Sequence, residues 1–353
     1  MAVDIGGGTQ VVGSGPLDVA SKGWSIRHRL MLLALAVALP FMLLTVGIVW
    51  QLASNERETR REAILFSTRA LMNAVDAILN KQVAVAELLA KSPALQTDDL
   101  TAFRAEAERA AKGLSGGWIV ISDQDGNQLV NLIRPAGASL PRRPPHAVEL
   151  QRRAIETGQI QISDVFTGAV LESPVITVEV PVQRRGKPPL CLTVGMEPRI
   201  FLPLFEQWNL PEGWLAGLID RNGNFIARSR NQDTYVGKPA SEGFRAAASG
   251  SRQGWNEMIS LEGGKIANGH VTSPLSQWVM GLAADKTLFE APIRNTIMIA
   301  GLAGGATTLL SLLLAIWSAR RIARPIEQIE QGTHALVHRR AITFSNTGVP
   351  EID

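Results

Sequence analysis

Three kinds of hydrophobic pattern follow one another along this chain, and the first is a long apolar run that occurs twice. Residues 31–50 (MLLALAVALPFMLLTVGIVW) and 295–319 contain no charged side chain. A helix rises about 1.5 Å per residue, so about 20 residues cross the roughly 30 Å hydrocarbon core of a bilayer. The runs therefore predict transmembrane helices over 30–52 and 295–319. Pro40 is compatible with the first, because membrane helices tolerate proline.

The first apolar run also resembles a signal peptide, because it lies near the N-terminus. It is longer than the apolar part of a typical signal peptide, and no clear A-x-A cleavage site follows it. We therefore interpret it as a retained anchor in the lipid bilayer.

The second pattern has the period of a helix. After residue 53, a stripe recurs every three or four positions: Ile64, Thr68, Leu71, Val75, Ile78, Gln82, Val85 and Leu89. It predicts a helix that ends near Ser92-Pro93, and a second helix is predicted over 99–111 after a Thr-Asp cap signal. These helices make up a segment 53–112. The stripe has two explanations: it packs on its own domain, or it meets a partner helix across a dimer axis, since coiled-coil seams often carry polar members.

The third pattern consists of short strands around acidic, glycine-containing turns. DQDGN at 123–127 lies between two apolar runs, and so does DRNGN at 220–224. Such sequences favour tight hairpins, because glycine accepts the positive φ that the turn needs. The copies are offset by 97 residues (220 minus 123), and a helical stretch and three strands follow each. The repeat predicts two α+β modules with antiparallel sheets, at 113–205 and 206–290.

This order of elements resembles the double Cache, or tandem PAS-like, extracytoplasmic sensors of bacteria. The stretches NLIRPAGASLP, ETGQIQISDVFTG and ITVEVPVQRRGKPPLCLTVGM are similar to the membrane-distal module of many sensor histidine kinases. The resemblance implies two PAS-like modules on a long N-terminal helix, flanked by two transmembrane helices. It also implies a function: the input part of a sensor histidine kinase, which binds a small solute outside the membrane.

Residues 320–340 (RRIARPIEQIEQGTHALVHRR) resemble the first helix of a HAMP signal-relay domain, and 343–353 resemble its connector. A HAMP domain is a parallel four-helix bundle made by two subunits, so the resemblance implies a homodimer. We expect the HAMP domain over 320–353 to be incomplete, and no kinase or other output module within these residues. Chemoreceptors and cyclic-dinucleotide enzymes share this input architecture and remain alternative parents.

Charge sets the expected orientation in the membrane. The net charge is +3, and basic residues flank the two apolar runs on the outer sides: Lys22, Arg27, Arg29, Arg320, Arg321 and Arg324. The positive-inside rule then predicts a two-pass inner-membrane protein with both termini cytoplasmic and residues 53–294 periplasmic. The Gly- and Ser-rich segment 1–29 is predicted to be a disordered tail. No basic block is interleaved with aromatic residues, so nucleic-acid binding is not expected.

Candidate catalytic and metal sites fail on their context. DQDGN is not a calcium loop, because Gly126 breaks the ligand alternation and Arg134 stands where a glutamate should close the shell. His146 and His270 are isolated in sequence, and Ser115 in GLSGG follows a helix, where a nucleophile elbow needs a strand. We expect no metal, no cofactor and no catalysis in this chain. A membrane-tethered periplasmic enzyme is the alternative from another class.

The candidate ligand site lies in the distal module, because the resemblance implies that small molecules bind between a sheet face and its covering helix and loops. The candidate residues are Trp118, Arg134, Asp164, Phe166, Thr177 and Glu179, with Ser163 on the same strands. Arg134 is expected to pair with a ligand carboxylate. The Tyr- and Asp-rich pattern of amino-acid-binding double Cache domains is absent, so an amino-acid ligand is not favoured.

Alternation divides the strand VITVEV into two faces. It sends Ile176, Val178 and Val180 to the core, and it leaves Thr177 and Glu179 either on the pocket or in water. The single cysteine, Cys191, excludes an intrachain disulfide, and its apolar strand context predicts a buried core residue.

Overall fold

The computed structural model describes residues 26–114, 116–287, 294–295, 297–314 and 316–317. The chain divides into two compact units: Ala53–Asn295, and Met1–Leu52 together with Thr296–Asp353. Most of the predicted N-terminal tail, Ser115 and the whole HAMP-like segment lie outside the described residues. Those expectations stay predictions.

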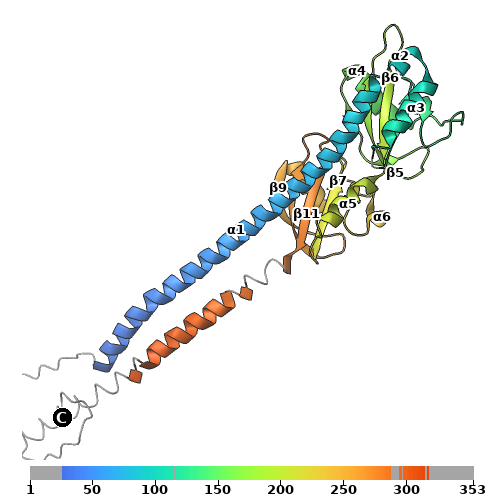
Figure 1. The fold of residues 1–353 in the computed structure, drawn as a ribbon. Coiled ribbons are helices and arrows are strands. Elements are labelled where there is room, and N and C mark those ends of the chain that lie inside the picture. Colours follow the sequence, from blue (N-terminus) through green and yellow to red (C-terminus); the bar gives the residue numbers. More distant parts are fainter. Residues whose placement is uncertain (1–25, 115, 288–293, 296, 315, 318–353) are drawn as a thin grey trace, which may run out of the picture. The chain divides into compact units, whose positions relative to one another are not determined.

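One continuous helix, α1 (Ile26–Ala90), contains both the first apolar run and the residues of the 4-3 stripe (Figure 1). It ends two residues before the capping Ser92, whose Oγ accepts from the Ala94 N–H at 3.2 Å at the start of α2 (Pro93–Thr97). Helix α3 (Leu100–Ala111) follows the Asp99 cap, whose carboxylate accepts from the Ala102 N–H at 2.9 Å. The predicted helix ends and the predicted cap are confirmed.

Two antiparallel sheets follow, and their strands have equivalent orders. The distal sheet runs β2-β1-β6-β5-β3, and the proximal sheet runs β8-β7-β11-β10-β9. The distal strands are β1 (Gly117–Ser122), β2 (Gln128–Asn131), β3 (Gln161–Ile162), β4 (Phe166–Thr167), β5 (Pro174–Val182) and β6 (Leu190–Met196), with β4 paired to β5. The proximal strands are β7 (Trp214–Ile219), β8 (Phe225–Arg228), β9 (Gln253–Ile259), β10 (Lys265–Thr272) and β11 (Val279–Asp285). The α+β class and the internal repeat are confirmed.

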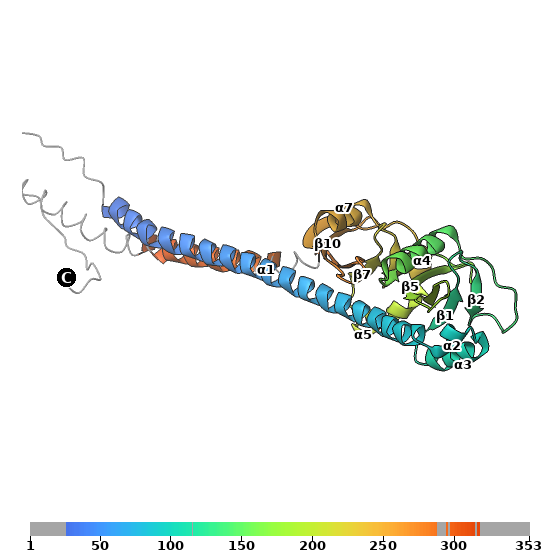
Figure 2. The same cartoon turned by 90° about the horizontal axis from the view of Figure 1, so that it is seen from above.

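Helices cover both faces of the two sheets. Figure 2 shows α4 (Pro145–Thr157) and α7 (Glu242–Gly250) on the side of the sheets opposite α1. Three short helical segments complete this part of the chain. The segments η1 (Pro198–Phe201) and α5 (Leu202–Gln207) connect β6 to β7, and α6 (Gln232–Tyr235) follows β8. Each module is therefore a sheet between α1 and its own covering helix.

The two repeated turns have the same geometry. Gly126 and Gly223 have φ values of 84° and 80°, where a side chain would be strained. The first aspartate of each copy holds the turn: Asp123 accepts from the Asp125 and Asn127 N–H groups at 3.0 and 2.9 Å, and Asp220 accepts from Asn222 and Asn224 at 2.9 and 2.8 Å. The acidic residues thus serve the hairpins β1–β2 and β7–β8, as the sequence predicts.

The stripe on α1 packs against the chain's own modules. Six of its eight residues, including the polar Thr68 and Gln82, are buried, whereas Ile78 and Val85 are half-buried. The apolar members pack in one core cluster with strands of both sheets. A Cβ built on Gly269 of the proximal sheet would lie 2.8 Å from Ile64, and one on Gly117 of the distal sheet would lie 3.2 Å from Gln82. Of the two explanations for the stripe, packing on its own domain is observed. The stripe gives no support for a partner helix, and the homodimer stays a prediction.

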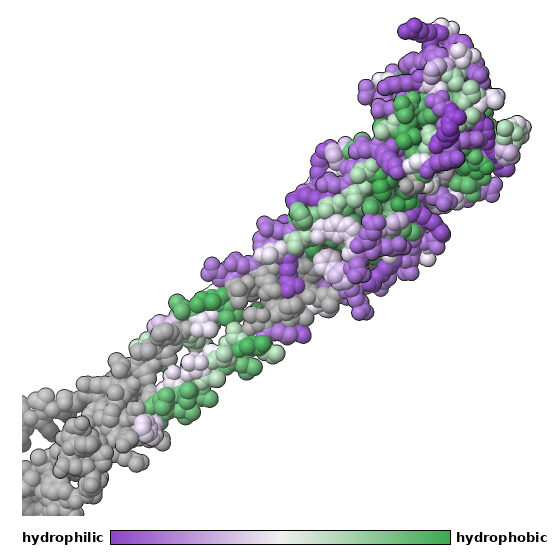
Figure 3. All heavy atoms as spheres, viewed as in Figure 1, coloured by the Kyte–Doolittle hydropathy of each residue, from purple (hydrophilic) through white to green (hydrophobic). Residues whose placement is uncertain are grey.

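Among the described residues, one helical segment is long and apolar enough to cross a membrane: Ile297–Leu314, with a mean hydropathy of 2.0. The corresponding stretch in α1, Met42–Gln51, is shorter, although its large apolar side chains are exposed. Both segments have hydrophobic surfaces in Figure 3. The second predicted span thus has the required length and composition, and the first is not confirmed by this criterion.

Candidate functional site

The register of the distal sheet places the candidate residues in rows. Trp118 on β1 lies opposite Gly195 on β6, which lies opposite Thr177 on β5. Two residues further along, Val120, Thr193 and Glu179 form the next row. Side chains alternate between faces, so both rows lie on the face away from α1. On the other face Ile176, Val178 and Val180 are buried in the core, as the alternation in VITVEV predicts.

Gly195 allows the Trp118 ring to lie against the sheet. A Cβ on Gly195 would stand only 2.4 Å from Cε2 of the indole, a distance that real side chains do not show. The ring therefore covers the glycine and makes an apolar platform beside Thr177. The glycine is needed here for close approach.

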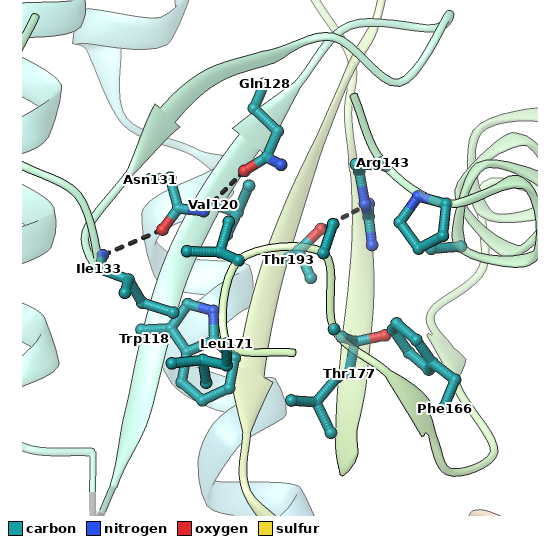
Figure 4. Close-up of a pocket in the computed structure, with 16 residues that line it drawn as sticks. Trp118, Val120, Gln128, Asn131, Ile133, Arg143, Phe166, Leu171, Thr177 and Thr193 are labelled. Atoms are coloured by element: carbon teal, nitrogen blue, oxygen red, sulfur yellow. Dashed lines mark hydrogen bonds between the residues drawn. The ribbon is translucent and has the colours of Figure 1, made fainter. Parts of the chain in front are cut away.

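A cavity of about 60 Å³ lies between this face, the start of α4 and the loop after β4 (Figure 4). Its apolar lining includes Trp118, Val120, Ile133, Pro144, Ala147, Phe166, Leu171 and Val175, and its polar lining is Gln128, Asn131, Arg143, Thr177 and Thr193. Ligand cavities usually measure roughly 300–1,000 Å³. The occupant must therefore be very small, or the loop 168–173 must move outward to admit it.

An ion pair is buried under this cavity. Arg143 donates to both carboxylate oxygens of Glu179, at 2.5 and 2.8 Å, and to Gln151 and Thr193, both at 2.9 Å. The side chains of the pair are 6% and 0% exposed. Burial raises the pKa of Glu179, but the charge of Arg143 and hydrogen bonds from Arg143 and Thr193 outweigh it and hold that pKa below its ordinary value. The carboxylate is therefore ionised.

Cys191 belongs to the same network. Its thiol donates to Glu179 at 3.2 Å, and burial, followed by the Glu179 charge, raises the pKa of the thiol well above its ordinary value. The thiol stays protonated, so Cys191 is a buried and unreactive core residue, as predicted.

The structure brings some of the sequence candidates together and leaves others apart. Trp118, Phe166 and Thr177 line the cavity side by side, and Glu179 reaches it through Arg143. The Ser163 hydroxyl accepts from the Thr177 N–H at 2.8 Å. Arg134 is exposed and does not line the distal cavity, and its backbone carbonyl accepts from Arg104 at 2.7 Å. Ligand binding by these residues stays a prediction.

Asp164 lies outside the distal cavity, at the junction between the two modules. It accepts from the Arg221 N–H and Nε at 3.1 and 2.8 Å, and from the Asn222 amide at 3.2 Å. In return, the Val165 N–H donates to Asp220 at 3.2 Å and Arg221 donates to the Ile162 carbonyl at 2.7 Å. The DRNGN turn therefore docks on the β3–β4 connection, immediately beside the Phe166 wall of the cavity.

The sequence interpretation misses Arg143, which lies in the proline-rich stretch PRRPPH. One signal was present. Glu179 sits in an otherwise apolar strand, and a buried carboxylate requires a cation or several hydrogen-bond donors. Nothing in the sequence identifies which arginine supplies them.

The proximal module has the equivalent rows, but its own side chains fill the space. Leu215, Ala283 and Asn268 correspond in register to Trp118, Gly195 and Thr177. In the next row, a Cβ on Gly281 would lie 2.6 Å from Phe244 and one on Gly217 would lie 3.0 Å from Phe225. The remaining cavity is about 30 Å³.

Comparison with known proteins supports the fold. No family model matches the chain, and no curated protein matches it in sequence. The ligand-binding domain of the Campylobacter jejuni chemoreceptor Tlp3, solved with L-valine, is 12% identical, with 69% of this chain and 97% of that chain covered and a TM-score of 0.50. The domain of the Pseudomonas fluorescens chemoreceptor CtaA, solved with L-isoleucine, is 14% identical, with coverages of 66% and 95% and a TM-score of 0.49.

The extracellular domain of the candidate histidine kinase rpHK1S-Z16 is also similar, with 14% identity, coverages of 68% and 97% and a TM-score of 0.48. Identities this low describe the fold alone. The chain therefore has the fold of the Tlp3 ligand-binding domain, and its two sheets of equivalent strand order agree with the tandem PAS-like fold that the sequence resemblance implies.

Proposed function

We propose that this chain is the sensory input part of a transmembrane receptor and that its distal module binds a small solute. The observation that carries the proposal is the difference between two modules of one fold. The distal module keeps a cavity against its sheet, lined by Trp118, Phe166 and Thr177, whereas Phe225 and Phe244 fill the equivalent space in the proximal module. The similar domains are ligand-binding domains, which agrees with input without catalysis.

The parent protein is proposed to be a histidine kinase, because NLIRPAGASLP, ETGQIQISDVFTG and ITVEVPVQRRGKPPLCLTVGM are similar to the membrane-distal module of many sensor histidine kinases. A chemoreceptor fits the similar domains equally well. In both cases the chain crosses the membrane twice, its modules lie in the periplasm, and a homodimer relays the signal.

A route for the signal follows from the junction between the modules. A solute that displaces Phe166 also displaces Asp164 and Val165, which bond to the DRNGN turn of the proximal module. The last proximal strand, β11, precedes the apolar helix Ile297–Leu314 in the chain. A small shift of that helix is the kind of movement that receptors pass across a membrane.

A ligand screen with one blocking variant tests the proposal. The full chain in lipid nanodiscs is heated with a library of amino acids, carboxylates and uncharged solutes. Ala169→Trp, on the exposed part of the loop over the cavity, blocks the mouth of the cavity, and Gln183→Trp adds the same side chain at an exposed site elsewhere on the module. We expect at least one solute to raise the unfolding midpoint of the wild type and of Gln183→Trp, but not of Ala169→Trp. The absence of any such solute contradicts the proposal.

A further inference from the structure

We infer that the distal cavity takes a small uncharged solute, with an apolar body and one hydroxyl, carbonyl or carboxamide group. The inference rests on the proposed function, that this cavity is the ligand site. This neutral solute differs from the carboxylate ligand that the sequence predicts from Arg134. Arg134 lies outside the cavity, and the arginine that lines it is Arg143.

The charge of the cavity is already balanced within the protein. Among the lining residues only Arg143 is charged, and its guanidinium bonds both oxygens of Glu179. A ligand carboxylate would have to lie beside the Glu179 carboxylate, and a ligand ammonium would lie beside the Arg143 guanidinium. Burying an unpaired charge is strongly unfavourable, so both ends of an α-amino acid are disfavoured here.

Most polar groups of the cavity already bond to one another. The Asn131 amide donates to Gln128 at 2.6 Å and accepts from the Ile133 N–H at 3.0 Å, while Gln128 donates to the Pro141 carbonyl at 2.7 Å. The Thr193 hydroxyl accepts from Arg143 and donates to Glu179 at 2.6 Å. These groups shape the wall and leave little hydrogen-bonding capacity for a ligand.

Thr177 is the exception. Its hydroxyl is near enough to Glu179 to help lower the pKa of that carboxylate, but the geometry falls short of a hydrogen bond, and the oxygen is buried without a partner among the described residues. A hydroxyl both donates and accepts, so it can bond an alcohol, a carbonyl or an amide equally. An unpaired buried hydroxyl is costly, and a ligand that pairs it recovers that cost.

The remaining walls fit an apolar body. The Trp118 ring lies across Gly195, and Phe166 is held from behind by an edge contact with His146, whose ring centroid is 4.4 Å away. Figure 4 shows both aromatic rings with Leu171 and Thr177 around the cavity. A flat or branched apolar group would rest between these rings with its single polar group toward Thr177. Because the cavity measures only about 60 Å³, a group of that size requires the loop 168–173 to move outward.

Matched pairs of probes test the charge of the ligand. Binding to the full chain in nanodiscs is measured by calorimetry for benzamide against benzoate, butyramide against butyrate, and isobutanol against L-valine. We expect at least one neutral probe to bind at least about tenfold more tightly than its charged counterpart. Thr177→Val should weaken that binding roughly three- to tenfold, Thr177→Ser should restore it, and the exposed Thr167→Val should leave it unchanged.

Two outcomes overturn the inference. In the first, a charged probe binds as tightly as its neutral counterpart and Ala169→Trp abolishes that binding, which leaves the receptor function in place. In the second, no neutral probe binds. If the wider solute library then also gives no stabilisation that Ala169→Trp removes, the proposed function fails as well.

Discussion

The buried ion pair of Arg143 and Glu179 makes the stability of the distal module depend strongly on a single residue. Both side chains are almost entirely buried, so the charge of each is compensated mainly by the other. We predict that Glu179→Gln destabilises the full chain by about 3–5 kcal/mol, because the Arg143 charge is left buried and unpaired. Urea unfolding followed by circular dichroism measures the loss, and Glu172→Gln at an exposed position of the same module is the control.

The ion pair also predicts how the stability of the wild type and of Glu179→Gln changes with pH. The pKa of Glu179 in the folded chain is below its ordinary value of 4.5, so the pair contributes its full stability above that value and loses it as pH falls through the folded pKa. Burial raises the pKa values of Asp76 and Asp220, so these two groups favour the folded state as pH falls. They are present in the wild type and in the variant alike, and their contribution cancels in the comparison. The wild type should therefore lose more stability than Glu179→Gln on acidification below about pH 4.5. Parallel curves would contradict the assignment.

Residues on strands were predictable from sequence because alternation fixes which face they occupy. Trp118 and Thr177 reach the cavity for this reason. Residues in loops were not predictable, since no period applies there. Arg143 lies 36 positions from its partner Glu179. Arg134 lies in a turn, where its N–H donates to the Asn131 carbonyl at 3.2 Å. The charge of the site was therefore the part that the sequence could not give.

At the scale of elements, the second hairpin turn does more than reverse the chain, because it joins the two modules. Arg221 in that turn bonds Asp164 and the Ile162 carbonyl, and both charged side chains of its ion pair are partly exposed. We predict that Arg221→Ala costs less than about 1 kcal/mol of stability, as is usual for partly exposed pairs. It should nevertheless speed hydrogen exchange at the Val165 amide, whose acceptor Asp220 is next to the altered residue.

Mass-spectrometric hydrogen exchange on the full chain measures this local opening. Arg199→Ala removes an ion pair with Asp233 in which both side chains are exposed, so it serves as the matched control. If both variants leave exchange at the β3–β4 connection unchanged, the DRNGN turn does not hold that connection, and the proposed signal route loses its first step.

The helices show a second limit of sequence patterns. The 4-3 stripe correctly predicted a helix but not its partner, because Thr68 and Gln82 resemble the polar members of a dimer seam. In the structure the Thr68 hydroxyl donates to the Ile64 carbonyl of its own helix at 2.7 Å, and Gln82 packs against Gly117. A helix that runs along two sheets buries such a stripe without any partner chain.

At the scale of the whole molecule, the modules can sense an external solute only if the chain crosses the membrane as predicted. Ile297–Leu314 has the length and composition of a span, and the first apolar run is supported by its uncharged sequence and its basic N-terminal flank. The two runs and the repeat were predictable from sequence alone, because a bilayer requires a minimum length of apolar residues and the hairpin turn of each module has a characteristic sequence. The relay beyond residue 317 lies outside the described residues.

The chain's single cysteine makes the topology directly measurable. Cys191 is buried, and its pKa is raised, so it should not react with a membrane-impermeant maleimide. In intact spheroplasts we predict labelling of Arg185→Cys, at an exposed position of the distal module, and no labelling of Ser14→Cys in the predicted cytoplasmic tail. Permeabilised cells should label both, which controls for accessibility. Labelling of Ser14→Cys in intact spheroplasts would contradict the predicted cytoplasmic N-terminus. Protection of Arg185→Cys would place the distal module in the cytoplasm, where it could not sense an external solute.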